Sequence, residues 1–195
     1  CPKGGALRRH RLQWLYLTRE GGIDRRALRV LHIAPALALR TCLEQAKLLT
    51  YVTAALAHPS VTVRTDLTKS GFADGAFDLI ICSHVLEHIP DDHAAMAELR
   101  RLLSVTGTAV VLVPVRARSA VTEEDLAVAS RADRLRLYGH PEHVRYYGRD
   151  VVDRLAAAGL DVDTVDYADA LDPDELTRIA ATNGEPLYIC RRFFP

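Results

Sequence analysis

The chain lacks the features of a membrane-spanning, secreted or strongly charged protein. No apolar run approaches the ~18 residues that a transmembrane helix needs, and no signal peptide is visible. Basic and acidic residues balance at 25 each, so no global field favours nucleic acid or an anionic membrane. The four cysteines are few and lie far apart in the sequence, which indicates the reduced thiols of a cytoplasmic protein rather than a disulfide framework.

Charge is nevertheless unevenly distributed along the chain. Residues 1–29 carry eight basic and two acidic side chains, whereas the remainder is net acidic. One interpretation is a basic arm that meets a protein partner through the Arg-rich helix at 7–19; the simpler one, which we prefer, is a solvated helix face that pairs with the body. We therefore divide the chain into an N-terminal basic helical arm, 1–26, and an α/β domain, 27–195.

The most informative stretch is FADGAFDLIICSHVLEHI at residues 72–89. Asp74-Gly75 is a tight-turn pair, and 77–82 is then an apolar run of strand length. A strand that is apolar on both faces suits the centre of a parallel sheet covered by helices on both sides. It ends at Ser83-His84, at the carboxyl end of a strand, where open α/β sheets place their ligand-binding groups.

Strand and helix patterns alternate along the chain, which predicts a parallel sheet with right-handed crossovers. Helical spacing or capping residues predict helices over 7–19, 37–47, 90–103 and 150–158, the third of them capped by Thr106-Gly107. Apolar or alternating runs predict strands over 28–34, 48–53, 61–65, 77–82, 109–113, 161–167 and 187–190.

The stretch at 72–89 resembles strand four and the following turn of the class I S-adenosylmethionine (SAM)-dependent methyltransferases of the methyltransferase type 11 kind. They commonly read F-x-D-x-x-F-D-x-(apolar)₃-x-x-(apolar)-L-E-H-(apolar). The resemblance implies a single-domain Rossmann-like fold with a seven-stranded, mostly parallel sheet in the order 3-2-1-4-5-7-6. Helices would cover both faces, the seventh strand would run antiparallel, and the cofactor would be SAM.

The cofactor loop expected after the first strand departs from the family pattern D-x-G-x-G. His32 stands at the acidic position, and Ala34 and Ala36 stand at the two glycine positions. Alanine still permits close approach but resists positive φ, and Pro35 removes one backbone donor. The resemblance thus assigns His32, Ala34 and Ala36 to cofactor binding through a degenerate motif.

Further cofactor positions follow along the sheet. The acid that usually grips the ribose aligns with Ala55, 19 residues after Ala36, so this carboxylate is missing. The resemblance places Asp66-Leu67 at the adenine and Ser83 toward the sulfonium. A turn-capping role is the alternative for Asp66.

His84 is the candidate catalytic residue, as a general base for the acceptor. The alternative is a helix-start histidine bonded to backbone. His84 and His88 share a helical spacing, but a metal site needs a third ligand such as Asp91, Asp92 or His93, and Leu-Glu-His occurs in the resembled family without metal. Residues 1–5, CPKGG, resemble half of a zinc-ribbon knuckle that lacks its second thiol. We predict no metal site.

The segment 115–148 is rich in Arg, Tyr and His and has the length of a functional lid. Arg145, Tyr146 and Tyr147 are candidates for enclosing a small organic acceptor; an ordered loop that caps the following helix is the alternative. No stacking platform accompanies a basic stripe, so no nucleic-acid partner is expected.

Three functions remain to be compared. The first is a SAM-dependent methyltransferase acting on a small molecule, and the second is a non-catalytic methyltransferase-like binding or assembly domain that has lost its grip on the cofactor. An NAD(P)-dependent enzyme is disfavoured, because no G-x-G-x-x-G follows the first strand.

Overall fold

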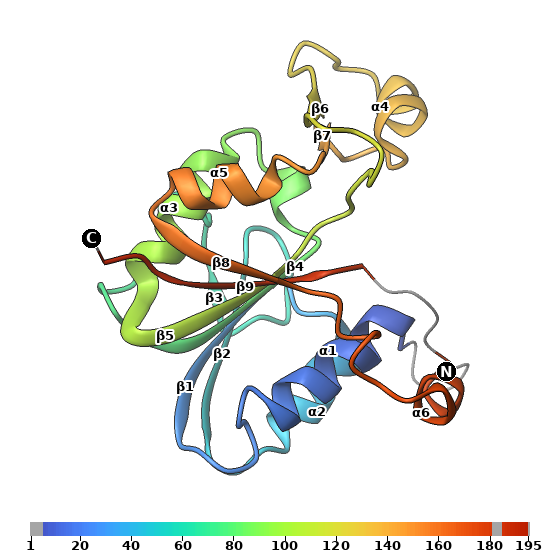
Figure 1. The fold of residues 1–195 in the computed structure, drawn as a ribbon. Helices are drawn as coiled ribbons and strands as arrows, with labels where there is room; N and C mark the ends of the chain where they lie inside the picture. Colours follow the sequence, from blue (N-terminus) through green and yellow to red (C-terminus); the bar gives the residue numbers. More distant parts are fainter. Residues whose placement is uncertain (1–5, 181–184, 195) are drawn as a thin grey trace.

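A seven-stranded sheet in the order β3-β2-β1-β4-β5-β9-β8 forms the centre of the molecule (Figure 1). It is seen in a computed structural model that describes residues 6–180 and 185–194. Its strands are β1 (Leu28–Ile33), β2 (Leu49–Ala55), β3 (Val63–Arg64), β4 (Phe77–Ser83), β5 (Leu103–Leu112), β8 (Leu160–Val165) and β9 (Leu187–Arg192). Strand β9 is antiparallel to β5 and β8, and the other pairs are parallel. The predicted fold class and strand order are confirmed.

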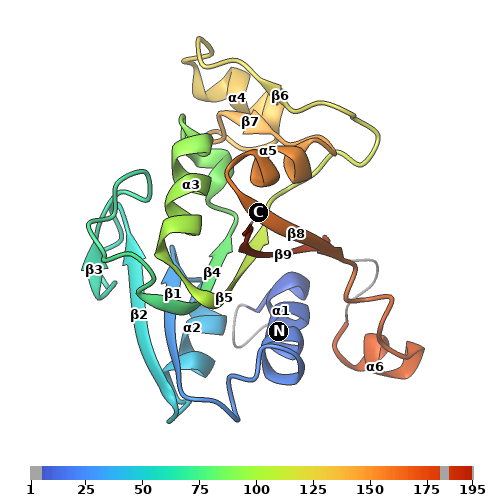
Figure 2. The ribbon, with the colours of Figure 1, turned by 60° about the vertical axis from the view of Figure 1, so that its left-hand side comes forward.

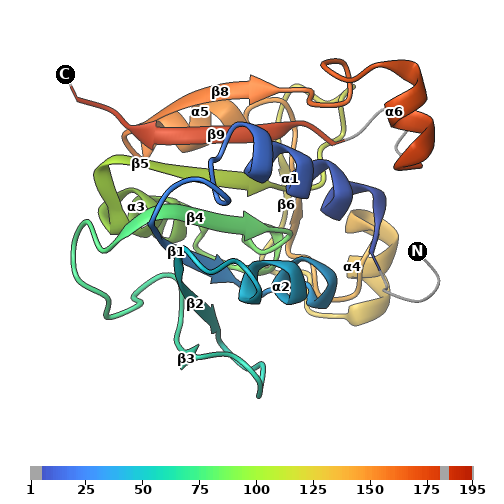
Figure 3. The same cartoon turned by 90° about the horizontal axis from the view of Figure 1, so that it is seen from below.

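Helices cover both faces of the sheet. Helices α3 (Asp92–Leu102) and α5 (Val151–Ala157) lie on one face, and α1 (Arg8–Arg19) and α2 (Leu37–Glu44) lie on the other (Figures 1 and 3). Neighbouring residues of one strand enter different cores: Ile80 packs with the residues of α3, and Ile81 packs with those of α1 and α2. The apolar run of β4 is continuous because both of its faces are buried.

The passage from α3 into β5 differs from the prediction. The helix ends at Leu102 and the strand begins at Leu103, so the predicted cap at Thr106-Gly107 is wrong. Gly107 lies inside β5, where an added Cβ would lie 2.9 Å from the carbonyl oxygen of Phe77. The register between β4 and β5 shifts at this point, and glycine permits the close approach of the two backbones.

The segment 115–148 is more regular than its sequence predicts. It contains helix α4 (Arg131–Tyr138) and a two-stranded antiparallel sheet of β6 (Glu123–Glu124) and β7 (Arg145–Tyr146). Figure 2 shows it beside α3 and α5. The single-turn helix η1 (Leu86–His88) follows β4 and contacts β7.

The basic side chains of α1 partly pair with the body of the molecule. Arg19 forms an ion pair with Glu175 of helix α6 (Pro173–Arg178), and Arg11 donates to the carbonyl oxygen of Ala180. Among the residues described, no helix is both long and apolar enough to cross a membrane. The three cysteines in the described ranges, Cys42, Cys82 and Cys190, are free thiols; Cys1 lies outside them.

Candidate functional site

A cavity of about 410 Å³ lies at the carboxyl ends of β1, β2 and β4. Its walls come from Ile33 and Ala34, from residues 54–58 at and beyond the end of β2, from residues 65–67 after β3 and from the turn after β4. Glu142 reaches it from the segment 115–148. Sites for small ligands are typically roughly 300–1,000 Å³. The cavity therefore has the place and size of a ligand site in an open α/β sheet.

The backbone after β1 adopts, at Ala34, the conformation for which the family motif has a glycine. Ala34 has φ 44°, in the left-handed region, and its N–H donates to the carbonyl oxygen of Ala54 at 2.7 Å. Ala36 has φ −67° and is the N-cap of α2, so only the first of the two glycine positions requires positive φ. A strained alanine at a cavity wall is the kind of backbone feature that concentrates at ligand sites.

His32 lies behind the wall rather than in the cavity. Its side chain is 1% exposed, and Nδ1 lies 2.8 Å from the hydroxyl oxygen of Tyr51 on β2. Burial lowers the pKa of His32 to about 3, so the ring is neutral. This histidine can shape the strand end through its hydrogen bond but does not face the cavity.

Ala55 and Asp66 both lie at the cavity wall. Ala55 ends β2, and no acidic residue stands among the neighbouring wall residues 54–58. The Asp66 carboxylate accepts hydrogen bonds from the backbone N–H and the hydroxyl of Thr68, both at 2.8 Å. These bonds use Oδ1, so the turn orders Asp66 while Oδ2 remains available for a ligand.

His84 lies between two carboxylates at the end of β4. Its Nε2 is 2.8 Å from Glu185 Oε2, and its Nδ1 is 3.1 Å from Oε1 of the fully buried Glu87. Burial alone would lower the pKa of His84, but the hydrogen bonds to Glu185 and Glu87 outweigh it and raise the pKa to about 9. The imidazole is therefore a cation near neutral pH, with both nitrogens facing carboxylates.

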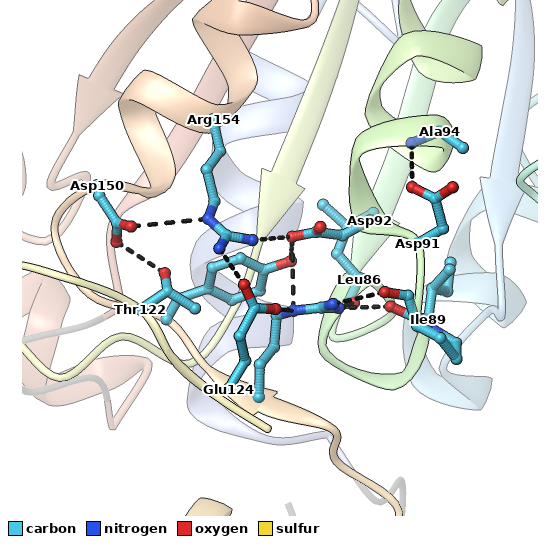
Figure 4. A network of polar contacts seen from close by, with 12 residues as sticks. Leu86, Ile89, Asp91, Asp92, Ala94, Thr122, Glu124, Asp150 and Arg154 are labelled. Atoms are coloured by element: carbon cyan, nitrogen blue, oxygen red, sulfur yellow. Dashed lines mark hydrogen bonds and ion pairs between the residues drawn. The ribbon is translucent and has the colours of Figure 1, made fainter. Parts of the chain in front are cut away.

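Arg145 is buried and bonded to the turn after β4, of which Figure 4 labels the acceptor residues Leu86 and Ile89. Its guanidinium donates to the carbonyl oxygens of Leu86 at 2.9 Å and Pro90 at 2.8 Å, and also to that of Ile89. Its Nε donates to Glu124 at 2.9 Å. These contacts use most of the N–H donors of the Arg145 guanidinium. The side chain therefore positions the turn and has few donors left to bind an acceptor.

The neighbouring tyrosines differ in their surroundings. The hydroxyl of the buried Tyr147 donates to Asp92 Oδ2 at 2.7 Å, and Arg154 donates to the same oxygen at 2.9 Å (Figure 4). Tyr146 stacks under the guanidinium of Arg116, 4.5 Å from its ring centroid. Both tyrosines are thus engaged within the protein.

The structure brings four of the ten predicted site residues together at the cavity: Ala34, Asp66, Leu67 and His84. The others lie elsewhere among the described residues: His32, Ala36, Ser83, Arg145, Tyr146 and Tyr147. Sequence reasoning missed Glu142, Glu185 and the charge of Glu87. Only Glu87 carried a signal, as the acidic residue of the Leu-Glu-His motif.

Comparisons with known proteins agree with the fold. Residues 26–111 match the family model described as a methyltransferase domain. None of the curated proteins compared with the chain matches it. The match and the fold confirm the predicted resemblance to class I methyltransferases.

Solved structures show the same fold at low identity. The 1,6-didemethyltoxoflavin-N1-methyltransferase of Burkholderia thailandensis, with bound 1,6-didemethyltoxoflavin and S-adenosylhomocysteine, is 14% identical, with coverage of 97% and 80% of the two chains and a TM-score of 0.61. A SAM-dependent methyltransferase from Mesorhizobium loti is 16% identical, with 96% and 99% coverage and a TM-score of 0.59. The [4+2]-cyclase SpnF is 14% identical, with 95% and 82% coverage and a TM-score of 0.65. The fold thus also occurs in a protein named for a different reaction, so function must be argued from the site.

Proposed function

We propose that this chain, whose residues 26–111 match a methyltransferase domain, binds SAM in the 410 Å³ cavity and methylates a small organic acceptor. The observation that carries the proposal is the cavity itself, which joins the strained Ala34 after β1, Asp66 after β3 and the turn after β4. When bound, SAM supplies a methyl group activated by a sulfonium. The protein then has to orient the acceptor and exclude water.

The residues present fit such a cofactor, with a weakened grip. Ala34, Ala54, Ala55 and Ala57 contribute small side chains to the wall, and Asp66 offers a carboxylate oxygen to an amino group. The carboxylate expected at Ala55 is missing. A charge-assisted pair to ribose hydroxyls is worth about 2–4 kcal/mol, so we expect weak rather than absent binding.

The acceptor would enter where the turn after β4 meets the segment 115–148. His88 and Glu142 line the cavity there. Arg145 and Tyr147 hold this rim in place through their buried contacts and are therefore assigned positioning roles. His84, with a carboxylate on each ring nitrogen, orders the end of β4 instead of removing the acceptor's proton.

Calorimetric titration of the intact chain with SAM and S-adenosylhomocysteine tests the proposal. We expect saturable binding of both, which Asp66→Ala weakens at least fivefold; Asp169→Ala, at an exposed site outside the cavity, serves as the control. No binding of either compound at millimolar concentration would contradict the proposal. The absence of a ribose carboxylate would then favour the second candidate, a non-catalytic binding or assembly domain.

A further inference from the structure

Three histidines from two distant segments meet at the rim of the cavity. His88 ends η1, whereas His140 and His143 lie between α4 and β7. The ring centroids of His88 and His140 each lie 4.7 Å from that of His143, and those of His88 and His140 are 5.5 Å apart. One nitrogen of each ring can be chosen so that all three lie within 4.8 Å of one another.

The hydrogen bond of His143 fixes the orientation of its ring and which ring nitrogen is free to bind a metal ion. Its Nδ1 lies 3.2 Å from the carbonyl oxygen of Tyr138, so it donates there and leaves the lone pair on Nε2. Histidines that bind metals commonly donate their second ring N–H in this way. His140 Nδ1 accepts from the backbone N–H of Glu142 at 3.2 Å, a bond on the surface that metal coordination would replace.

A buried negative charge lies behind the cluster. Glu87 is fully buried, and its Oε1 is 3.9 Å from His143 Nε2 and 3.1 Å from His84 Nδ1. His84 pairs with Oε1, whereas Oε2 has no hydrogen-bond partner in the described part of the chain. A buried carboxylate with one oxygen left unsatisfied favours a further cation nearby.

The backbone holds the two segments together on either side of the cluster. The N–H of Val144 donates to the carbonyl oxygen of Glu87 at 2.9 Å, next to both His143 and His88. Arg145 adds its three bonds to the turn that contains His88. The rings are therefore brought together by the fold and not by a flexible surface loop.

We propose that His88, His140 and His143 bind one divalent transition-metal ion of the zinc type, each through one ring nitrogen. Three imidazoles with no thiolate suit Zn²⁺, Ni²⁺ or Cu²⁺ and do not suit Mg²⁺ or Ca²⁺, which prefer oxygen. Because His88 also lines the cavity, we place the fourth coordination position toward it. An ion there would orient an acceptor through an oxygen, nitrogen or sulfur atom; this role rests on the proposed function, whereas the metal site does not.

Titration of metal-free, tag-free protein with Zn²⁺ tests the site. We expect one ion per chain with a Kd in the micromolar range or tighter, and at least a tenfold weakening in His140→Ala and in His143→Ala. His93→Ala, a histidine on the exposed side of α3, should bind Zn²⁺ like the unaltered chain. Far-ultraviolet circular dichroism of His140→Ala checks that the variant is folded.

Cobalt reports the geometry independently of affinity. The chain loaded with Co²⁺ should show the intense visible absorption of a four-coordinate ion, and His140→Ala should lose it. Equal Zn²⁺ binding by the unaltered chain and the His140→Ala/His143→Ala double variant would overturn the site, as would a six-coordinate Co²⁺ spectrum. Titration of the same samples with SAM keeps the two proposals apart, since either ligand can fail to bind while the other binds.

Discussion

His84 and Glu185 are separated by 101 positions in the chain, yet His84 Nε2 lies 2.8 Å from Glu185 Oε2. The contact joins the end of β4 to a residue two positions before the start of β9. Because Glu87 contacts the other nitrogen, protonation of one ring satisfies two carboxylates at the same time. The free energy of unfolding should therefore depend on pH through the protonation of His84.

We expect the free energy of unfolding to fall as the pH rises from about 6.5 to about 9. The folded-state pKa of His84 is raised to about 9 by the hydrogen bonds to Glu185 and Glu87, which outweigh the effect of burial. Its contribution is therefore complete below the unfolded-state pKa and is lost as the pH rises through the folded-state value. The loss should be on the order of 2 kcal/mol.

Urea unfolding at several pH values measures this effect as the difference between the unaltered chain and His84→Gln. His32 and His143, whose pKa values burial lowers, are neutral in both folded and unfolded states at the upper end of this range, and they cancel in the difference. A difference that does not change between pH 6.5 and 9 would show that the ring is not charged in the folded protein.

Ala55→Asp should tighten SAM binding at least tenfold. The new carboxylate would stand at the end of β2, at the cavity wall, where the family's ribose-binding acid is expected. Ala55→Asn is the matched control, because it has the same shape without the charge and should gain much less. Equal affinities of the unaltered chain and Ala55→Asp in calorimetry would place the ribose elsewhere.

Arg145→Lys should destabilise the fold by about 3–5 kcal/mol, because a lysine cannot reach three carbonyl oxygens and Glu124 together. Arg149→Lys is the control: Arg149 is exposed and donates to one carbonyl oxygen, that of Ala117, so the change should stay within about 0.5 kcal/mol. Urea unfolding measures both. Equally small decreases in the free energy of unfolding for the two variants would mean that the hydrogen bonds of the buried guanidinium are dispensable.

Ala34→Gly should leave stability unchanged to within about 0.5 kcal/mol. The relief of φ 44° is worth about 1 kcal/mol and offsets the greater freedom of glycine in the unfolded chain. Ala38→Gly, inside α2, should cost about 1 kcal/mol because it has no such relief. Equal losses in thermal unfolding would mean that Ala34 is not strained in solution.

The sheet could be predicted from sequence because its signals are local. Strand β4 is apolar at every position from Leu79 to Cys82, and that run with its flanking turn carried the family resemblance that implied the order of the strands. The start of β5 at Leu103 could not be predicted, because Gly107 resembles a helix cap and its real role depends on Phe77 of another strand.

The site was less accessible to sequence reasoning. Ala34, Ala55 and Asp66 were placed at the cavity by alignment with a motif, since each follows a strand end. An arginine such as Arg145 is a common ligand-binding residue. Only the three-dimensional structure shows that its guanidinium already donates hydrogen bonds to three backbone carbonyl oxygens. The meeting of His88 with His143 likewise depends on how the segment 115–148 folds back.

The bond between Arg145 and Leu86 also bears on the order in which the molecule matures during synthesis. The carbonyl oxygens of Leu86, Ile89 and Pro90 receive their buried donor from a residue made 59, 56 and 55 positions later. Until that residue has left the ribosome, the turn after β4 must keep these oxygens hydrated or leave them unsatisfied. The ligand-facing turn is thus encoded early in the chain but finished late, after β5 and the whole segment that follows it have emerged.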